Sequence, residues 1–125
     1  MADDREVMVL DDEPIVGDRL RPVLEKAGFG VEIFTDSAQA IARLGEKSFA
    51  VLITDMKMRG PSGMDVLRFV REHSPRTQVI VITGYATIET SHEASAWGAY
   101  RFIAKPFKLK ELVKLVAEAA RVTSA

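Results

Sequence analysis

The sequence predicts an α/β fold in which helices cover both faces of a doubly wound, five-stranded parallel sheet. Five apolar runs of strand length alternate along the chain with five segments of helical periodicity. Strict alternation of this kind is typical of parallel sheets, and burial on both faces explains why two of the runs are almost continuously apolar. Five such units are too few to close an eight-stranded barrel, so we expect an open sheet.

The elements are expected in the order βαβαβαβαβα. The first helix begins near Pro14, whose missing N–H costs nothing in a first turn, and ends before Gly28, which tolerates a left-handed backbone. Apolar residues repeat with helical period over 16–27 and again over 109–120. The predicted strands cover 7–10, 31–34, 50–54, 79–83 and 100–103, and weaker helices cover 37–45, 64–73 and 87–97.

Composition is that of one ordinary globular domain. The chain carries 17 Lys and Arg against 18 Asp and Glu, is 47% apolar, and contains no cysteine. A near-neutral chain offers no basic surface for nucleic acid or anionic membranes, and without cysteine it has no disulfide or thiolate chemistry. Since no apolar segment is long enough for a signal peptide or a membrane span, we expect a cytoplasmic protein. One domain would cover residues 1–125, with its core at about 6–121 and a tail-like composition over 121–125.

Polar side chains stand where four of the predicted strands end. Asp11 and Asp12 follow the first strand, Asp55 follows the third, Thr83 ends the fourth, and Lys105 follows the fifth after one alanine. In open α/β sheets ligands bind beyond the carboxyl ends of the strands, near the topological switch point. If the first and third strands are neighbours, three carboxylates converge there and need a cation. Oxygen ligands of this kind suit Mg²⁺, with Mn²⁺ as a substitute. Together with an ammonium and a hydroxyl, they are the groups needed to handle a phosphoryl group.

Each of these residues also has a simpler interpretation when it is taken alone. The acids at Asp11 and Asp12 could cap the first helix, since carboxylates favour a helix N-terminus. Asp55 could be a turn residue, Thr83 a plain strand exit, and Lys105 a loop lysine. Their joint occurrence at four strand ends favours the chemical interpretation over four separate coincidences.

Four segments resemble the receiver domain of two-component response regulators: VMVLDDEP, LITDMKMRGPSGMDVL, VIVITGYA and YRFIAKPF. The resemblance covers about residues 6–121 and implies a flavodoxin-like (βα)5 fold with strand order 2-1-3-4-5. The stretch over 82–107 is further similar to receivers of enhancer-binding transcription activators of the nitrogen-regulation type.

The resemblance assigns roles to the polar residues at the strand ends. Asp55 would be the phosphoacceptor, and Lys105 would pair with its carboxylate and then with the phosphoryl group. Mg²⁺ would be bound by Asp11, Asp12 and Asp55, together with the backbone carbonyl of Lys57.

The resemblance also implies a switch near the fourth and fifth strands. Thr83 would move its hydroxyl toward the phosphate, and the rotamer of Phe102 would report the change. The Lys105–Pro106 peptide bond would be cis. The chain reads Met-Arg-Gly over 58–60, where such domains usually have Met-Pro-Gly, which leaves the geometry of that loop open.

Two variable positions lie two residues past key site residues. They are Lys57, after Asp55, and Tyr85, after Thr83. In the family these positions influence how fast the phosphoryl group is lost, and a simpler interpretation is that both are exposed loop side chains.

By this resemblance the chain is a signalling domain and not an enzyme, with at most self-phosphorylation from small donors and self-dephosphorylation. Its partners would be a sensor histidine kinase, an effector domain beyond residue 125, and a second copy bound through the fourth helix, fifth strand and fifth helix. The fourth helix is expected to shift easily because 87–97 has few large apolar anchors.

Two other functions share parts of this pattern. An aspartate-nucleophile phosphohydrolase is the alternative, but such enzymes need an Asp-x-Asp arrangement, and here Asp55 is followed by Met56 and Lys57. A flavodoxin-like electron carrier would need a loop rich in Ser, Thr and Gly after the first strand, where this chain is acidic.

Overall fold

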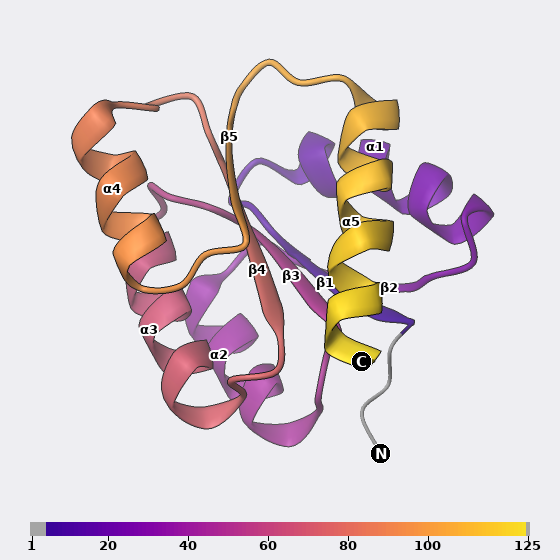
Figure 1. Ribbon diagram of the computed structural model, residues 1–125, viewed down its shortest axis with the longest axis horizontal. Helices are drawn as coiled ribbons and strands as arrows, with labels where there is room; N and C mark the ends of the chain where they lie inside the picture. Colours follow the sequence, from indigo (N-terminus) through magenta and orange to yellow (C-terminus); the bar gives the residue numbers. More distant parts are fainter. Residues whose placement is uncertain (1–4, 125) are drawn as a thin grey trace.

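The computed structural model describes residues 5–124, and the predicted alternation of strands and helices is confirmed (Figure 1). The elements are β1 (Glu6–Leu10), α1 (Pro14–Lys26), β2 (Gly30–Phe34), α2 (Ser37–Glu46), β3 (Val51–Asp55), α3 (Gly63–His73), β4 (Gln78–Thr83), α4 (Ile88–Ala96), β5 (Arg101–Ala104) and α5 (Leu109–Ser124). Among the described residues, no helix combines the length and the apolarity needed to cross a membrane.

The five strands form one parallel sheet in the order β2-β1-β3-β4-β5. This is the order 2-1-3-4-5 that the resemblance implied, and it makes β1 and β3 direct neighbours. From β1 the chain passes to β2 on one side and then crosses to β3 on the other, so the switch point lies between β1 and β3. The carboxyl ends of these two strands therefore flank the crevice in which a ligand is expected.

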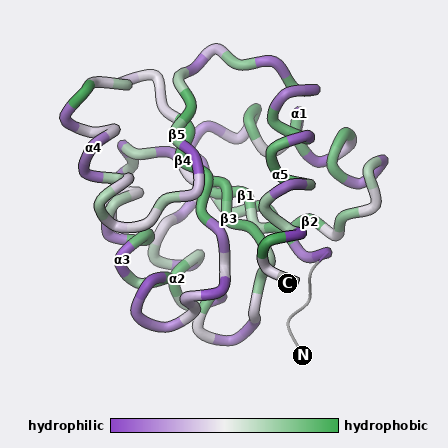
Figure 2. The backbone as a smooth tube through the Cα atoms, in the orientation of Figure 1, coloured by the Kyte–Doolittle hydropathy of each residue, from purple (hydrophilic) through white to green (hydrophobic). Residues whose placement is uncertain are grey.

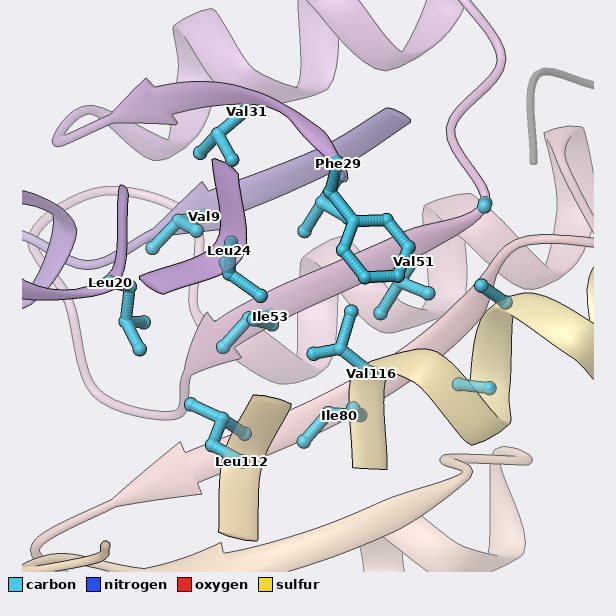
Figure 3. Packing of buried hydrophobic residues seen from close by; sticks show 14 of the residues in the cluster. Val9, Leu20, Leu24, Phe29, Val31, Val51, Ile53, Ile80, Leu112 and Val116 are labelled. Atoms are coloured by element: carbon cyan, nitrogen blue, oxygen red, sulfur yellow. The ribbon is translucent and has the colours of Figure 1, made fainter. Parts of the chain in front are cut away.

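Two apolar cores lie on opposite faces of the sheet, because successive strand residues point to opposite faces. Helices α1 and α5 cover one face, and Figure 3 shows their Leu24 and Val116 packed over Ile53. Helices α2, α3 and α4 cover the other face, where Met8 and Leu52 belong to the core. Figure 2 shows hydrophobic residues concentrated in the central strands and hydrophilic residues on the outer turns of the helices.

The predicted helix ends are confirmed for α1 and α4. Pro14 opens α1, Gly28 follows it with a φ of 98°, and Gly98 follows α4 with a φ of 86°. These positive φ values are conformations that only glycine adopts without strain.

The tail-like interpretation of residues 121–125 is wrong for the residues that the structure describes, while Ala125 lies outside them. Helix α5 continues to Ser124, and the side chain of Thr123 is buried. Its hydroxyl donates to the carbonyl of Ala50 at 2.9 Å, which ties the end of α5 to the segment entering β3. The composition of this segment gives no sign of the contact, because it depends on a single buried threonine.

Helix α4 is weakly anchored, as its sequence predicts. Ala94 is the buried residue of the helix, and the side chain of Ile88 is 74% exposed. The hydroxyl residues that make this segment a poor helix former instead cap its start, since Thr87 and Thr90 form a reciprocal capping box. Helix α4 thus combines a capped start with little apolar packing.

Candidate functional site

Three carboxylates converge at the carboxyl ends of β1 and β3. One oxygen each of Asp11, Asp12 and Asp55 lies within 4.8 Å of the others. Asp11 and Asp55 are buried, while Asp12 is partly exposed. Because β1 and β3 pair directly in the sheet, residues far apart in sequence meet here, as the sequence analysis expected.

Lys105 reaches this acidic group from the loop after β5. Its Nζ lies 2.8 Å from Asp11 Oδ2, 3.0 Å from Asp55 Oδ2 and 3.4 Å from Glu13 Oε1. The backbone N–H of Lys105 donates to the carbonyl of Thr83 at 2.8 Å, and the Lys105–Pro106 bond is cis, as the resemblance implied. Glu13 is a contact of this lysine that the sequence pattern does not indicate.

One ammonium among these acids leaves negative charge in excess. Burial raises the pKa of Asp11, and this effect outweighs the hydrogen bonds that Asp11 accepts from Lys105 and from the Glu13 N–H. Burial alone would lower the pKa of Lys105, but its hydrogen bonds to Asp11 and Asp55 raise it above the ordinary value. Lys105 is therefore a permanent cation, and the site still favours a further positive charge.

The helix-capping interpretation holds in part for Asp11 and fails for Asp12. The N-cap of α1 is Glu13, whose side chain makes no capping bond. Asp11 Oδ1 accepts the Glu13 N–H at 2.9 Å and so supports the turn that enters α1. Asp12 has no hydrogen bond or ion pair within residues 5–124, so its carboxylate is available to a ligand.

The loop after Asp55 depends on a glycine that the sequence analysis did not single out. The Gly63 N–H donates to the carbonyl of Met56 at 2.9 Å, and a Cβ at Gly63 would overlap the backbone oxygen of Asp55. The Met56 N–H in turn donates to Asp55 Oδ1 at 2.6 Å. Gly63 therefore permits the close approach of α3 that shapes this loop; the available signal was a glycine directly before an apolar helix.

The loop that reads Met-Arg-Gly over 58–60, where such domains usually have Met-Pro-Gly, is held against the start of α2. The carbonyl of Arg59 accepts a hydrogen bond from the Ser37 hydroxyl at 3.2 Å, and Gly60 adopts a φ of 75°. Lys57 and Tyr85 are both exposed, and the Lys57 Nζ lies 4.6 Å from the centre of the Tyr85 ring. The two variable positions thus contact each other at the rim of the site.

Thr83 and Phe102 occupy neighbouring strands on the α4 side. Thr83 is fully buried, and its hydroxyl accepts the Tyr85 N–H at 3.1 Å. It directly follows Ile82, which is paired with Asp55 in the sheet. Phe102 is half-buried and lines an open groove with Ile88 and other residues of the α4 N-terminus. The structure therefore brings the two residues to the face where α4 is weakly held.

The chemistry of the donors fits a divalent cation. Asp11, Asp12 and Asp55 supply only oxygen, and burial disfavours the charge of Asp11 unless a cation compensates it. Carboxylate ligands with room for water suit Mg²⁺ or Mn²⁺.

A family model now decides between the functions that share this site. The model described as the response regulator receiver domain matches residues 7–117. The chain belongs to the response regulator receiver domain family. It is a receiver domain of two-component response regulators, and neither the match nor the site favours the phosphohydrolase alternative.

Curated relatives agree with the resemblance to receivers of transcription activators. The receiver domain is 34% identical over 120 residues to an NtrX-like response regulator of Rickettsia bellii. It is 32% identical over 117 residues to the C4-dicarboxylate transport transcriptional regulatory protein DctD of Pseudomonas aeruginosa. Each match covers 94% of this chain and 25% of the relative, so the chain spans about a quarter of the length of these proteins.

Solved structures share the fold. The beryllofluoride-activated NtrC4 receiver domain dimer is 30% identical with a TM-score of 0.90, and the match covers 95% of this chain and 98% of that one. A Burkholderia pseudomallei response regulator with a phosphorylated aspartic acid, calcium ion and citrate is 25% identical with a TM-score of 0.84, over 96% of this chain and 71% of that one.

Proposed function

We propose that Asp55 accepts a phosphoryl group from a sensor histidine kinase in a Mg²⁺-dependent reaction, and that the modified site alters the surface formed by α4 and β5. The observation that carries the proposal is the Lys105 Nζ held between Asp11 and Asp55 inside an otherwise acidic crevice. A phosphorylated aspartic acid in the related Burkholderia pseudomallei response regulator supports it.

The transfer requires an ionised nucleophile and compensation of charge. A carboxylate oxygen of Asp55 attacks phosphorus, the P–O bond forms as the P–N bond of the phosphohistidine breaks, and the leaving imidazole nitrogen keeps the electron pair. The product is an acyl phosphate, which water can hydrolyse. Lys105 lies 3.0 Å from Asp55 and stabilises the negative charge that gathers on the phosphoryl oxygens. Small donors such as acetyl phosphate can supply the same group.

Mg²⁺, or Mn²⁺ in its place, would be held by Asp11, Asp12 and Asp55 with the backbone carbonyl of Lys57. When bound, the cation neutralises charge on the acids and on the phosphoryl oxygens. The carboxylate of Asp12, which has no partner among the described residues, supports this assignment, because a half-buried acid without a partner is otherwise unfavourable.

The switch follows from the added charge. The phosphoryl group brings roughly −1.5 to −2 charges and three acceptor oxygens to the site. The Thr83 hydroxyl would leave the Tyr85 N–H and donate to one of these oxygens, and Phe102 would turn toward the space that it leaves. The weak anchoring of α4 supports transmission of this change to the surface.

The altered surface would act on two partners, a second copy of the receiver domain and an effector domain. The homodimer would form through α4, β5 and α5, and the beryllofluoride-activated NtrC4 dimer supports this part of the proposal. Because the chain spans a quarter of the length of DctD and the NtrX-like relative, an effector domain beyond residue 125 that regulates transcription is the expected target.

Intact-mass measurement tests the phosphoacceptor. With acetyl phosphate and Mg²⁺ the protein should gain one phosphoryl adduct, and Asp55→Asn should gain none. Asp18→Asn is the matched control, because Asp18 is exposed on α1 and is not one of the three acids that converge at the strand ends. Full labelling of Asp55→Asn would reject the assignment.

Sedimentation velocity with and without beryllofluoride tests the switch. Coupling of about 1–3 kcal/mol would change the dimerisation constant by roughly 5- to 150-fold. Thr83→Ala should abolish the change and still be labelled at Asp55. Identical sedimentation in both conditions would show that the signal does not leave through this face.

A further inference from the structure

Two arginines of α3 contact the C-terminal end of the neighbouring helix α4 (Figure 1). Arg68 Nη2 lies 3.6 Å from Glu93 Oε1, and Arg68 Cζ lies 5.5 Å from the centre of the Trp97 ring. Arg71 packs against the turn that follows α4, since a Cβ at Gly98 would lie 3.2 Å from Arg71 Cδ. None of these residues belongs to the phosphoacceptor site described above.

The two arginines supply a charge that α4 itself lacks. Carbonyl groups without an intrahelical partner make the C-terminus of a helix attractive to cations. The last turn of α4 contains no basic side chain, and Trp97 and Gly98 follow it. Because Arg68 contacts Trp97 and Arg71 contacts Gly98, helix α3 provides the cations at this end of α4.

The surroundings of Arg71 support this interpretation. Its Nε is buried without a hydrogen-bond partner within residues 5–124, and no carboxylate in that range forms an ion pair with it. Its Nη2 donates to the carbonyl of Thr77, and burial lowers its pKa. A partly buried cation without an acid partner is unfavourable, and the carbonyl end of α4 is the negative group that this position offers.

The N-terminal end of α4 is held differently. Ile88 is 74% exposed, and the capping bonds between Thr87 and Thr90 remain within this end of the helix. No ion pair within residues 5–124 joins the first turn of α4 to another element. An open groove of about 560 Å³, lined in part by Ile88 and Phe102, lies beside it. Helix α4 is therefore attached to α3 at one end and loosely held at the other.

We propose that Arg68 and Arg71 are positioning residues that hold α4 where it lies in the unmodified protein and so restrain the switch until Asp55 is phosphorylated. The inference rests on the proposed function, because it takes α4 as the element that moves. Ala94 is the buried residue of α4, so the contacts at the helix end make up a large share of what fixes it. The pair between Arg68 and Glu93 is partly exposed and can break without opening the apolar core.

Amide hydrogen exchange of the unmodified protein tests the attachment itself. The amides of Gly98 and Ala99 donate hydrogen bonds back into α4, so they report on this end of the helix. Arg68→Gln should speed their exchange about 3- to 10-fold, because it removes an exposed ion pair and a cation–π contact. Arg21→Gln is the matched control, because Arg21 forms a similarly exposed ion pair on α1. Unchanged exchange in Arg68→Gln would overturn the proposal.

Two further variants identify the interactions. Glu93→Gln should add nothing to the effect of Arg68→Gln, because both variants break the same ion pair. Arg71→Lys keeps a cation at the end of α4, so its amides there should exchange more slowly than those of Arg71→Gln. Additive effects at Arg68 and Glu93, or equal exchange in the two Arg71 variants, would contradict the proposal. Urea unfolding of each variant separates a local change from a global one.

Sedimentation velocity tests the restraint on the switch. Without beryllofluoride, Arg68→Gln should dimerise about 3- to 10-fold more tightly than the unaltered protein, because more molecules have a displaced α4. With beryllofluoride the two proteins should agree within about twofold, since α4 has moved in both. Arg21→Gln should match the unaltered protein in both conditions. Equal dimerisation without beryllofluoride, or weaker dimerisation of Arg68→Gln with it, would overturn the proposal.

This inference and the proposed function fail in different ways. If beryllofluoride does not change the sedimentation of the unaltered protein, the proposed switch is wrong, and the exchange of Gly98 and Ala99 alone decides whether Arg68 holds α4. If beryllofluoride promotes dimerisation but Arg68→Gln changes neither exchange nor dimerisation, the switch stands and the role of Arg68 is wrong.

Discussion

Two clusters of charged side chains lie at opposite ends of the sheet strands, and they differ in the ratio of basic to acidic groups. The edge cluster, beside the start of β1, contains Glu6, Glu32, Arg43 and Lys47. In it, Lys47 Nζ lies 2.6 Å from Glu6 and 2.8 Å from Glu32, and Arg43 Nε lies 2.8 Å from Glu32. The acidic site, at the carboxyl ends, places one ammonium against Asp11, Asp55 and Glu13, while Asp12 has no partner within residues 5–124.

The pKa values follow this difference. In the edge cluster, hydrogen bonds led by the one from Arg43 lower the pKa of Glu32 to about 2. In the acidic site, burial raises the pKa of Asp11 although it contacts Lys105. A balanced cluster stabilises the fold, whereas an excess of buried acid costs stability. The proposed binding of a cation and a phosphoryl group would account for that excess.

The largest expected effect concerns labelling of the acidic site. Asp12→Asn should slow phosphorylation by acetyl phosphate about 100-fold and weaken Mg²⁺ binding in parallel, because a charge that holds the cation is lost. Glu32→Gln, in the edge cluster, is the control and should be labelled at the normal rate. Intact mass followed over time measures the labelling rate, and stopped-flow fluorescence measures Mg²⁺ binding. Normal labelling of Asp12→Asn would show that the acidic site does not need this carboxylate to hold the cation.

The second effect is on stability and its pH dependence. Glu32→Gln should lower the free energy of unfolding by about 1–2 kcal/mol near pH 7, since the ion pairs are partly exposed and screened. The folded-state pKa lies below the ordinary value of 4.5, so this stabilisation is complete above about pH 4.5 and is lost as the pH falls toward 2. Urea unfolding of both proteins across this range measures it. A difference that grows on acidification would contradict the pairing.

A smaller effect is expected on the stability of the acidic site itself. Without Mg²⁺, Asp12→Asn should leave the free energy of unfolding unchanged or raise it by about 0.5 kcal/mol, because one of several like charges is removed. Adding Mg²⁺ should raise the thermal midpoint of the unaltered protein more than that of the variant. A loss as large as that of Glu32→Gln would show that Asp12 serves the fold.

Much of this arrangement could be predicted from the sequence. The alternation of strands and helices specifies a parallel sheet, and the carboxyl ends of parallel strands share one edge, so Asp11, Asp55 and Lys105 were expected to meet. The sequence could not reveal contacts that depend on loop paths. Glu13 reaches Lys105 and Gly63 makes room for Asp55 only through the folded turns.

The end of α5 also depends on a contact that the sequence did not predict. The composition of residues 121–125 is that of a tail, yet Thr123 is buried and its hydroxyl donates to the carbonyl of Ala50, just before β3. Threonine counts as a polar residue in the composition, but its hydroxyl can be buried when it forms a hydrogen bond inside the protein.

Chemical trapping of the phosphorylated residue would establish whether Asp55 is the phosphoacceptor. The protein is labelled with acetyl phosphate and Mg²⁺, reduced with borohydride to convert the acyl phosphate to homoserine, and mapped by tandem mass spectrometry. The account predicts homoserine at position 55 alone, and none when Mg²⁺ is removed with chelator. Homoserine at position 11 or 12, or labelling that does not depend on Mg²⁺, would contradict it.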